Sequence, residues 1–303
     1  MAAQLRAVRA RIRAVKSIAK ITRAQELIAS SRIVRAQQRM RAAGPYSREL
    51  TQAVEAVVSR SATLNHPMIT EPESLTRAAV LILTSDGGFC GAYNANVLRE
   101  AARLRAHAED DRITPDTYVA GRKGIAWHRF RDIALAGSWS GFSAAPGYAA
   151  AEEIATALLD AYEKPASEGG VDEIFLVSTE FVSMLTQRPI VRRILPLEIE
   201  EREGERPGGA LPSYEFEPSP DKVLDALLPQ YVASRIYYAM LEAAASELAA
   251  RRRAMKAATD NANDLLDRLT REANNARQAE ITQEISEIVG GSNALAEANA
   301  GSE

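Results

Sequence analysis

The feature that most constrains the fold is an uninterrupted helical pattern near the C-terminus. Apolar or small residues recur there at alternating spacings of three and four through about five heptads without a proline, which is typical of a coiled coil. The seam consists of Leu241, Ala245, Leu248, Arg252, Met255, Thr259, Ala262, Leu266, Leu269, Ala273 and Ala276. Because much of this seam is alanine, we expect a thin, closely packed helix pair rather than a broad globular core.

A second helical pattern opens the chain and offers a partner for the first. The same spacing links Leu5, Val8, Ile12, Val15, Ala19 and Thr22, and resumes at Ala29, Ile33, Ala36 and Met40. Pro45 comes late in this segment, where we expect it to bend or interrupt the helix. The simplest arrangement is an antiparallel pair, with coiled-coil helices over residues 1–60 and 219–303.

Between these helices the apolar residues no longer follow the helical spacing. Short β-rich runs occupy residues 77–85, 116–121, 132–139 and 171–181, and helical patterns at 94–110 and 150–164 lie between several of them. Strands that alternate with helices indicate a mostly parallel sheet. We therefore expect an α/β fold: a long antiparallel two-helix coiled coil from the two termini plus a central Rossmann-like α/β domain with its flanking loops over residues 61–218.

Composition excludes several kinds of site. Cys90 is the only cysteine, so an intrachain disulfide or a cysteine-built metal site is ruled out. His66, His107 and His128 lie far apart and in no ligand spacing. No run of about 18 apolar residues occurs, so we expect no membrane-spanning helix. The sequence thus predicts neither a bound metal nor another cofactor.

The glycine-rich stretch LTSDGGFCGAYNAN, residues 83–96, raises the question of a phosphate-binding loop. A P-loop needs lysine and a hydroxyl residue after its last glycine, whereas Ala92 and Tyr93 follow Gly91. The spacing of the three glycines also differs from the dinucleotide fingerprint. We interpret the stretch as a tight strand-to-helix turn, with Cys90 an inert thiol, and expect no catalytic residue in this chain.

The charge is strongly uneven. Residues 1–44 hold eleven Lys and Arg against one acid, Glu26, which is a net charge of 11 − 1 = +10. Since the whole chain carries −3, the remainder carries −13. A basic arm of this kind is compatible with nucleic-acid binding, with docking on an acidic protein surface, or with a solvated helix face.

Three ordered motifs resemble the γ subunit of F-type ATP synthases. They are VKSIAKITRAQELIASSRIVRAQQRM at residues 15–40, the glycine-rich stretch at 83–96, and MKAATDNA at 255–262 followed by ARQAEITQEISEIVGGSNAL at 276–295. The resemblance covers essentially the whole chain. The segments AQELIASSR and TQEISEIVGG are most similar to those of actinobacterial members.

This resemblance implies a central rotor shaft without a catalytic site of its own. It implies a rod inside an α3β3 hexamer and a base on the c ring of the membrane sector, with the ε subunit alongside. The chain would be peripheral at the cytoplasmic face of the bacterial cell membrane. Proton-driven rotation of the c ring would then drive the catalytic β subunits through ATP synthesis.

The resemblance also implies roles for single residues. Contacts with the catalytic β subunits carry over onto Gln25, Arg251, Arg277, Gln278, Thr282 and Glu284, and contacts with the c ring onto Tyr214 and Glu217. Gly87 stands where relatives usually have arginine, so a charge contact of that loop is expected to be missing. Two other hypotheses remain: a basic coiled coil that binds nucleic acid, with salt-sensitive affinity, and an α/β enzyme that binds a nucleotide.

Overall fold

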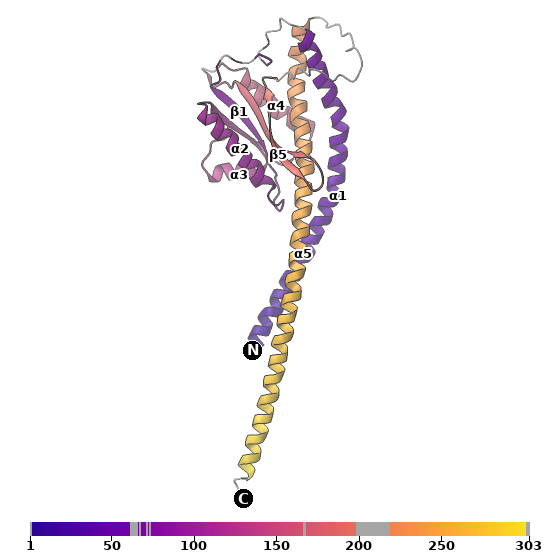
Figure 1. The fold of residues 1–303 in the computed structure, drawn as a ribbon, viewed down its shortest axis with the longest axis vertical. Helices are drawn as coiled ribbons and strands as arrows, with labels where there is room; N and C mark the ends of the chain where they lie inside the picture. The colour runs from indigo at the N-terminus through magenta and orange to yellow at the C-terminus, as the bar shows by residue number, and fades with distance from the viewer. Residues whose placement is uncertain are drawn as a thin grey trace. The chain divides into compact units, whose positions relative to one another are not determined.

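The computed structural model describes residues 2–60, 66, 68–70, 72, 74–165, 168–197 and 219–300. Two long helices, α1 (Ala2–Arg60) and α5 (Pro220–Ala300), enclose an α/β segment in the chain order (Figure 1). The structure divides into two compact units: residues 29–252, and residues 1–28 together with 253–303.

The unit of residues 29–252 is built around a five-stranded sheet with the order β3-β2-β1-β4-β5. Its strands are β1 (Arg77–Leu83), β2 (Thr114–Ala120), β3 (Gly137–Trp139), β4 (Glu173–Phe181) and β5 (Gln187–Leu195). The first four pair in parallel, and β5 pairs antiparallel with β4. The expected α/β class with a mostly parallel sheet is confirmed.

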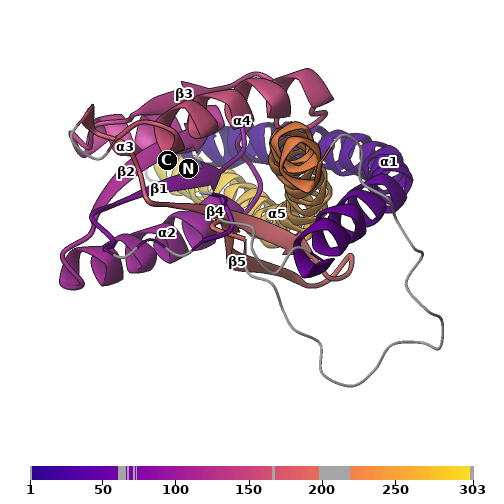
Figure 2. The same ribbon diagram turned by 90° about the horizontal axis from the view of Figure 1, so that it is seen from above.

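Helices cover both faces of this sheet (Figure 2). α2 (Tyr93–Asp110) and α3 (Arg122–Phe130) pack on one face, where Val80, Ile82 and Val97 are fully buried. α4 (Tyr148–Tyr162) and α5 pack on the other face, together with part of α1. Parallel strands buried on both faces explain why the β-rich runs of the sequence are almost continuously apolar.

The prediction of a thin helix pair is wrong for the part of α5 in this unit. Nearly every residue from 231 to 250 is buried, including Leu241 and Leu248 at 1 % exposure each. Small side chains such as Ala244 and Ala245 let other elements approach the helix closely on several sides, so the same alanines that suit a helix pair also suit a central core helix.

The other unit is a helix pair of the expected kind. In residues 253–276, burial is confined to one stripe, and Met255 and Leu269 are 5 % and 3 % exposed. Leu266 is half-buried at the edge of this stripe. On α1 the predicted seam residues Leu5, Val8 and Ala19 are buried. The buried residues of this unit therefore fall at positions of the expected seam, whose assignment as a whole stays a prediction.

Pro45 does not interrupt α1, which runs unbroken from Ala2 to Arg60. Two further elements were not predicted: α3, which has nine residues, and the antiparallel edge strand β5. The run at 132–139 forms a strand only over Gly137–Trp139.

A hydrogen bond between two hydroxyls gives a direct test of the helix register. Thr22 Oγ1 lies 2.7 Å from Thr259 Oγ1 across the pair. We expect Thr22→Cys with Thr259→Cys to form a disulfide readily on mild oxidation, because the thiols replace two hydroxyls that are in direct contact. Non-reducing electrophoresis after protease cleavage between the two sites would detect it.

Thr22→Cys with Thr270→Cys is the control, because Thr270 lies about 16 Å further along the helix. Equal oxidation of both pairs would contradict the register. The native Cys90 thiol is buried at 3 % exposure and does not compete.

Candidate interaction surfaces

The C-terminal part of α5 continues past the beginning of α1, its partner in this unit (Figure 1). From 281 to 292 every residue is exposed, because none of the segments that the structure describes packs against this length of helix. Four residues that the resemblance assigns to contacts with the catalytic β subunits lie in or next to this segment, and all are exposed: Arg277, Gln278, Thr282 and Glu284. The structure therefore brings these four side chains together on one accessible length of helix.

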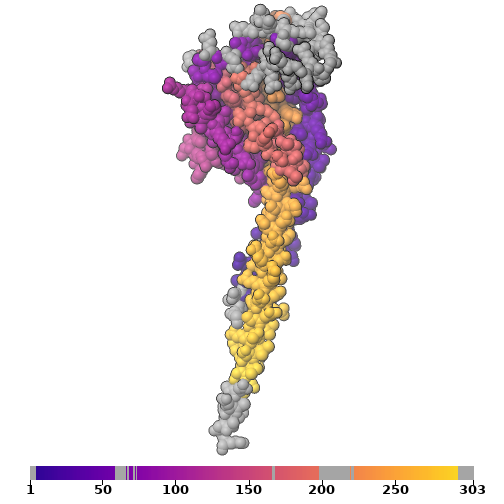
Figure 3. Space-filling model, in the orientation of Figure 1, coloured from indigo at the N-terminus to yellow at the C-terminus, as the bar shows by residue number. Residues whose placement is uncertain are grey.

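An apolar stripe accompanies these polar residues and was missed by the sequence analysis. Ile281, Ile285, Ile288 and Val289 are 45, 56, 71 and 53 % exposed. Their spacing of four, three and one places them on one face of the helix, beside Gln278 and Thr282. In the space-filling view this segment, coloured yellow, forms the narrow lower part of the molecule (Figure 3). An unpaired helix with such a stripe is suited to lie in a groove of a partner protein.

Gln25 lies on a comparable face of α1. Ile18, Ile21 and Ile28 are 52, 61 and 45 % exposed, and Gln25 falls between them at the helical spacing of three and four residues. Glu26, in contrast, is turned inward at 7 % exposure and accepts a hydrogen bond from Arg23 at 2.8 Å. The exposed face therefore combines isoleucines with a neutral amide, which is typical of a protein contact.

The positive charge of the N-terminal arm is also accessible. The eleven basic side chains are all exposed: Arg6, Arg9, Arg11, Arg13, Lys16, Lys20, Arg23, Arg32, Arg35, Arg39 and Arg41. Since Glu26 is the arm's one acid and is turned inward, the exposed charges of the arm are positive. Such a surface attracts an acidic partner.

The glycine-rich stretch forms the turn that the sequence predicts. Gly91 has φ +59°, a conformation that favours glycine, and Phe89 adopts the same value with its side chain 79 % exposed. Asn94 Oδ1 accepts a hydrogen bond from the backbone N–H of Ser85 at 2.9 Å, and Ser85 Oγ donates to the Gly87 carbonyl at 2.7 Å. The polar groups of the turn thus form hydrogen bonds within the chain itself.

Arg251 lies beside this turn, mostly buried. Its Nη2 donates to Glu247 Oε1 at 2.6 Å, and its Nε donates to the Gly88 carbonyl at 3.2 Å. The side chains of Arg251 and Glu247 are 14 % and 2 % exposed. A β-carbon at Gly87 would approach Arg251 Nη2 to 2.9 Å, so the glycine leaves room for the guanidinium. The contact of Arg251 with a catalytic β subunit stays a prediction.

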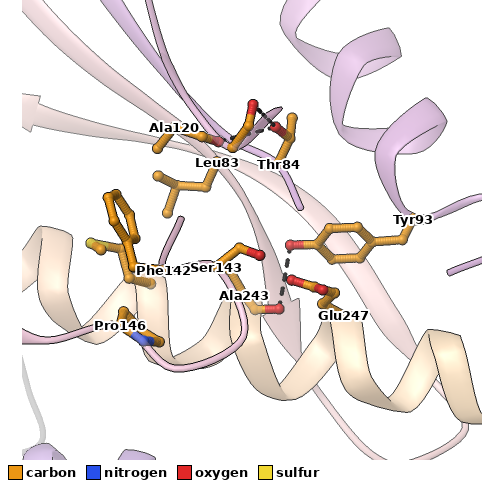
Figure 4. A pocket seen from close by; sticks show the side chains of 11 residues that line it. Leu83, Thr84, Tyr93, Ala120, Phe142, Ser143, Pro146, Ala243 and Glu247 are labelled. Carbon is orange, nitrogen blue, oxygen red and sulfur yellow. Dashed lines mark hydrogen bonds between the residues drawn. The ribbon is translucent and has the colours of Figure 1, made fainter. Parts of the chain in front are cut away.

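Burial raises the pKa of Glu247 above its ordinary value, although the Arg251 charge acts in the opposite direction. Figure 4 shows Glu247 beside Tyr93, whose hydroxyl donates to the Ala243 carbonyl at 3.3 Å. These residues line a cavity of about 20 Å³, room for roughly one water molecule. It lies at the carboxyl ends of β1 and β2, where open α/β sheets commonly bind ligands, and α5 covers it.

Asp86 fixes the neighbouring loops. Its carboxylate accepts hydrogen bonds from the backbone N–H groups of Arg122, Gly141 and Ser143 at 3.1, 2.8 and 2.9 Å. Burial would raise the pKa of Asp86, but these three donors and the Arg122 charge bring it below its ordinary value. Ser85 and Asp86 therefore serve as structural groups of the turn.

Two predicted contact residues, Tyr214 and Glu217, lie outside the described residues. Within the described part of the chain, no cluster of His, Cys, Asp or Glu is arranged to hold a metal ion. None of the helices described has a segment long and apolar enough to cross a membrane.

Comparison with known proteins assigns the class to which this architecture belongs. Residues 4–295 match the family described as ATP synthase. The chain is 57 % identical to the ATP synthase gamma chain of Thermobifida fusca over 306 residues, covering 100 % of both chains. It is 59 % identical to that of Acidothermus cellulolyticus over 295 residues, covering 97 % of this chain and 98 % of the relative. The chain belongs to the ATP synthase family, and within it to the gamma chains.

Solved structures agree on the fold. A chain in the rotor of the Euglena gracilis mitochondrial ATP synthase in rotational state 1 matches with a TM-score of 0.63 and 14 % identity, covering 93 % of this chain and 100 % of that one. A chain in the structure of the OSCP, F1 and c-ring of the same ATP synthase in rotational state 3 matches with a TM-score of 0.67 and 16 % identity. This match covers 97 % of the present chain and 95 % of the other one. The family match and the high identity to the actinobacterial gamma chains named above confirm the resemblance seen in the sequence.

Proposed function

We propose that this chain is the central rotor shaft of an F-type ATP synthase, which couples rotation of the c ring to conformational changes in the catalytic β subunits. The observation that carries this proposal is the unpaired end of α5, where an exposed apolar stripe adjoins Arg277, Gln278, Thr282 and Glu284. In a chain that aligns from end to end with gamma chains, such a segment is suited to lie inside a surrounding hexamer.

The proposed mechanism follows from the asymmetry of this segment. The apolar stripe occupies one face of the helix, so a quarter turn presents different side chains to a fixed neighbour. Arg277 and Gln278 can hydrogen-bond a loop of one β subunit and release it when the shaft has turned. Gln25 and the exposed isoleucines of α1 would offer a second such contact. The shaft would thereby impose a different conformation on each catalytic subunit in turn.

Arg251 would contribute differently, because its guanidinium is already bonded to Glu247 and Gly88. Arginine has five N–H donors, and those left over could donate to a carboxylate of a β subunit, since 14 % of the side chain stays exposed. We expect this contact to depend on the ion pair with Glu247, which holds the guanidinium in place.

The remaining assignments are part of the same proposal. Tyr214 and Glu217 would contact the c ring, the ε subunit would bind alongside, and the assembly would lie at the cytoplasmic face of the bacterial cell membrane. The chain itself would supply no catalytic residue and no cofactor. Nucleic acid is not among the proposed partners, since the basic arm would instead face an acidic surface of a β subunit.

Arg277→Ala combined with Gln278→Ala tests the proposed coupling contact. We expect ATP synthesis in proton-driven membrane vesicles to fall by about tenfold, because a hydrogen bond to a charged group contributes about 1.5–3 kcal/mol. Both side chains are exposed, so the thermal melt of the chain should not change. The rate of synthesis at a fixed proton gradient is the measurement.

Arg99→Ala on α2 is the matched control, since Arg99 is an exposed arginine of the α/β unit. Normal synthesis by the Arg277/Gln278 variant in a correctly assembled complex would refute the role of these residues.

A further inference from the structure

Helix α1 carries a second apolar face, besides the one that packs against α5. Its residues follow one another at spacings of three and four, and all of them are exposed, with Ile18 and Ile21 at 52 and 61 %. A stripe with this period is suited to pack against another helix. This α1 face consists of Ala7, Ala10, Ala14, Ile18, Ile21, Gln25 and Ile28.

The charges around the α1 face are positive. Within residues 1–28 the one acid, Glu26, is turned inward at 7 % exposure. A helix that lies on the α1 face should therefore combine an apolar stripe with carboxylates beside it. The seven basic side chains of this segment are all exposed: Arg6, Arg9, Arg11, Arg13, Lys16, Lys20 and Arg23.

The chain itself contains a helix with both properties. In residues 277–292, here called the α5 end, three carboxylates stand against one cation, Arg277, which is a net charge of 1 − 3 = −2. Each carboxylate directly precedes an isoleucine of the exposed stripe, so the acids form a row along one side of that stripe. These carboxylates are Glu280, Glu284 and Glu287, beside Ile281, Ile285 and Ile288.

The two surfaces cannot meet within one copy. The contact of Thr22 with Thr259 places Ile18, four residues earlier on the antiparallel helix, level with residue 263. Ile285 lies about 33 Å further along α5, at 1.5 Å per residue. Since α5 is one helix as far as Ala300, its end does not fold back onto α1. The helix that matches the α1 face must come from a second copy.

We propose that two copies of the unassembled chain pair by exchange, with the α5 end of each lying on the α1 face of the other. A twofold axis relates the copies, so every contact occurs twice. The pairing removes from water two apolar stripes that a single copy exposes. The shaft would present the same surfaces to the hexamer, so α and β subunits should displace the second copy. This displacement rests on the proposed function, whereas the pairing does not.

Sedimentation equilibrium of the purified full chain tests the pairing, because it gives the mass of a molecule independently of its shape. The monomer mass is 32.9 kDa. We expect the average mass to rise towards twice this value with concentration, with a dissociation constant of roughly 10 µM, since the interface is of modest size. A chain that stays monomeric up to about 100 µM overturns the proposal.

Two variants examine the two surfaces separately. Ile285→Gln with Ile288→Gln alters the α5 end, and Ile18→Gln with Ile21→Gln alters the α1 face. We expect each variant to raise the dissociation constant by at least about tenfold, because apolar side chains are lost from both symmetric contacts. All four side chains are at least half exposed, so the thermal melt should not change.

Phe130→Gln with Leu185→Gln is the matched control, since these large apolar residues of the α/β unit are 85 and 77 % exposed. It should leave the dissociation constant unchanged. If the control abolishes the dimer and the isoleucine variants do not, the proposal is wrong. It is equally wrong if the α1-face variant dimerises like the unaltered chain, because the α5 ends would then pair with each other.

Charge and mixing complete the test. Glu284→Lys with Glu287→Lys should also weaken the dimer, and less so at high salt, whereas Glu109→Lys with Asp110→Lys on α2 should not. A tagged α5-end variant should retain the α1-face variant, since the first keeps its α1 face and the second its α5 end. Neither variant should retain an untagged copy of itself. Absence of retention between the two variants, in a chain that dimerises unaltered, overturns the exchange.

The pairing and the shaft function fail in different ways. A chain that is monomeric at every concentration but joins α and β subunits in an active complex overturns the pairing alone. A chain that dimerises as described but forms no complex with competent α and β subunits overturns the shaft function and leaves the pairing intact.

Discussion

Leu269→Asp is expected to separate the paired helices of the unit formed by residues 1–28 and 253–303. Leu269 is 3 % exposed on the stripe of α5 that faces α1. Loss of a buried leucine costs about 2–5 kcal/mol, and an unpaired carboxylate at the same place adds a further desolvation penalty. The helix pair has few other large apolar groups, because its seam also contains Ala262 and Thr259. We therefore expect this unit to lose its fixed pairing while the α/β unit stays folded.

Two measurements check this result. Circular dichroism should show an early loss of helix on heating, before the main transition, and the Thr22/Thr259 cysteine pair should no longer oxidise selectively. Leu27→Asp is the control, since Leu27 is a leucine of the same unit at 57 % exposure. An unaltered melt and unaltered cysteine pairing in the Leu269 variant would contradict the packing described for this helix pair.

Arg251→Met is the second substitution with a large expected effect. It leaves the Glu247 carboxylate, 2 % exposed, without its cation. Removing one partner of a buried ion pair costs about 3–5 kcal/mol, because the other charge stays buried and unpaired. The double variant Glu247→Leu with Arg251→Met should recover much of this loss. Urea unfolding of the two variants is the measurement, and equal stabilities of both would show that the unpaired Glu247 carboxylate carries no such penalty.

The pH dependence of this effect has a definite sign. Burial raises the folded-state pKa of Glu247 above its unfolded value. The folded state therefore binds the proton more tightly, and stability from this group is greatest in acid and falls as pH rises through the raised pKa. Without Arg251, which lowers this pKa, the fall should extend to higher pH. The deficit of Arg251→Met relative to the double variant should thus be larger at about pH 7 than at about pH 5.

The sequence predicted the parts of the fold that repeat. The positions of Leu5, Val8, Met255 and Leu269 follow the 3-4 spacing so regularly that the seam could be placed without coordinates. The alternation of strands with helices likewise indicated the parallel sheet. The extent of burial around residues 231–250 was not predicted. Periodicity shows which face of a helix is apolar, but not how many elements pack against its remaining faces.

The missed elements have local causes. β5 is an edge strand whose residues are mostly half-buried, and Pro189, Arg192 and Arg193 break any apolar alternation in it. α3 has only nine residues, and Gly124 within it weakens the helical pattern. Gly124 is nevertheless required, because a β-carbon there would come within 2.7 Å of Thr84 Oγ1. The glycine is therefore needed for a tertiary contact, and a local sequence pattern gives no sign of such a contact.

The candidate contact residues could be named from the sequence only through the resemblance. The structure adds their exposure and the apolar stripe beside them. The signal for that stripe was present, since Ile281, Ile285 and Ile288 follow one another at helical spacings of four and three beyond Ala276, the last residue of the predicted seam. The ion pair of Arg251 with Glu247 also has a visible i,i+4 spacing, but its burial depends on the turn at Gly87 and Gly88 packing against α5.

Reconstitution tests the central claim most directly. The purified chain is mixed with matching α and β subunits, and the size and ATPase rate of the product are followed. A shaft should co-elute with α and β in one large complex whose turnover is absent from the chain alone. If competent α and β subunits form no complex with it, and the chain instead binds DNA with an affinity that falls steeply with salt, the shaft function is wrong.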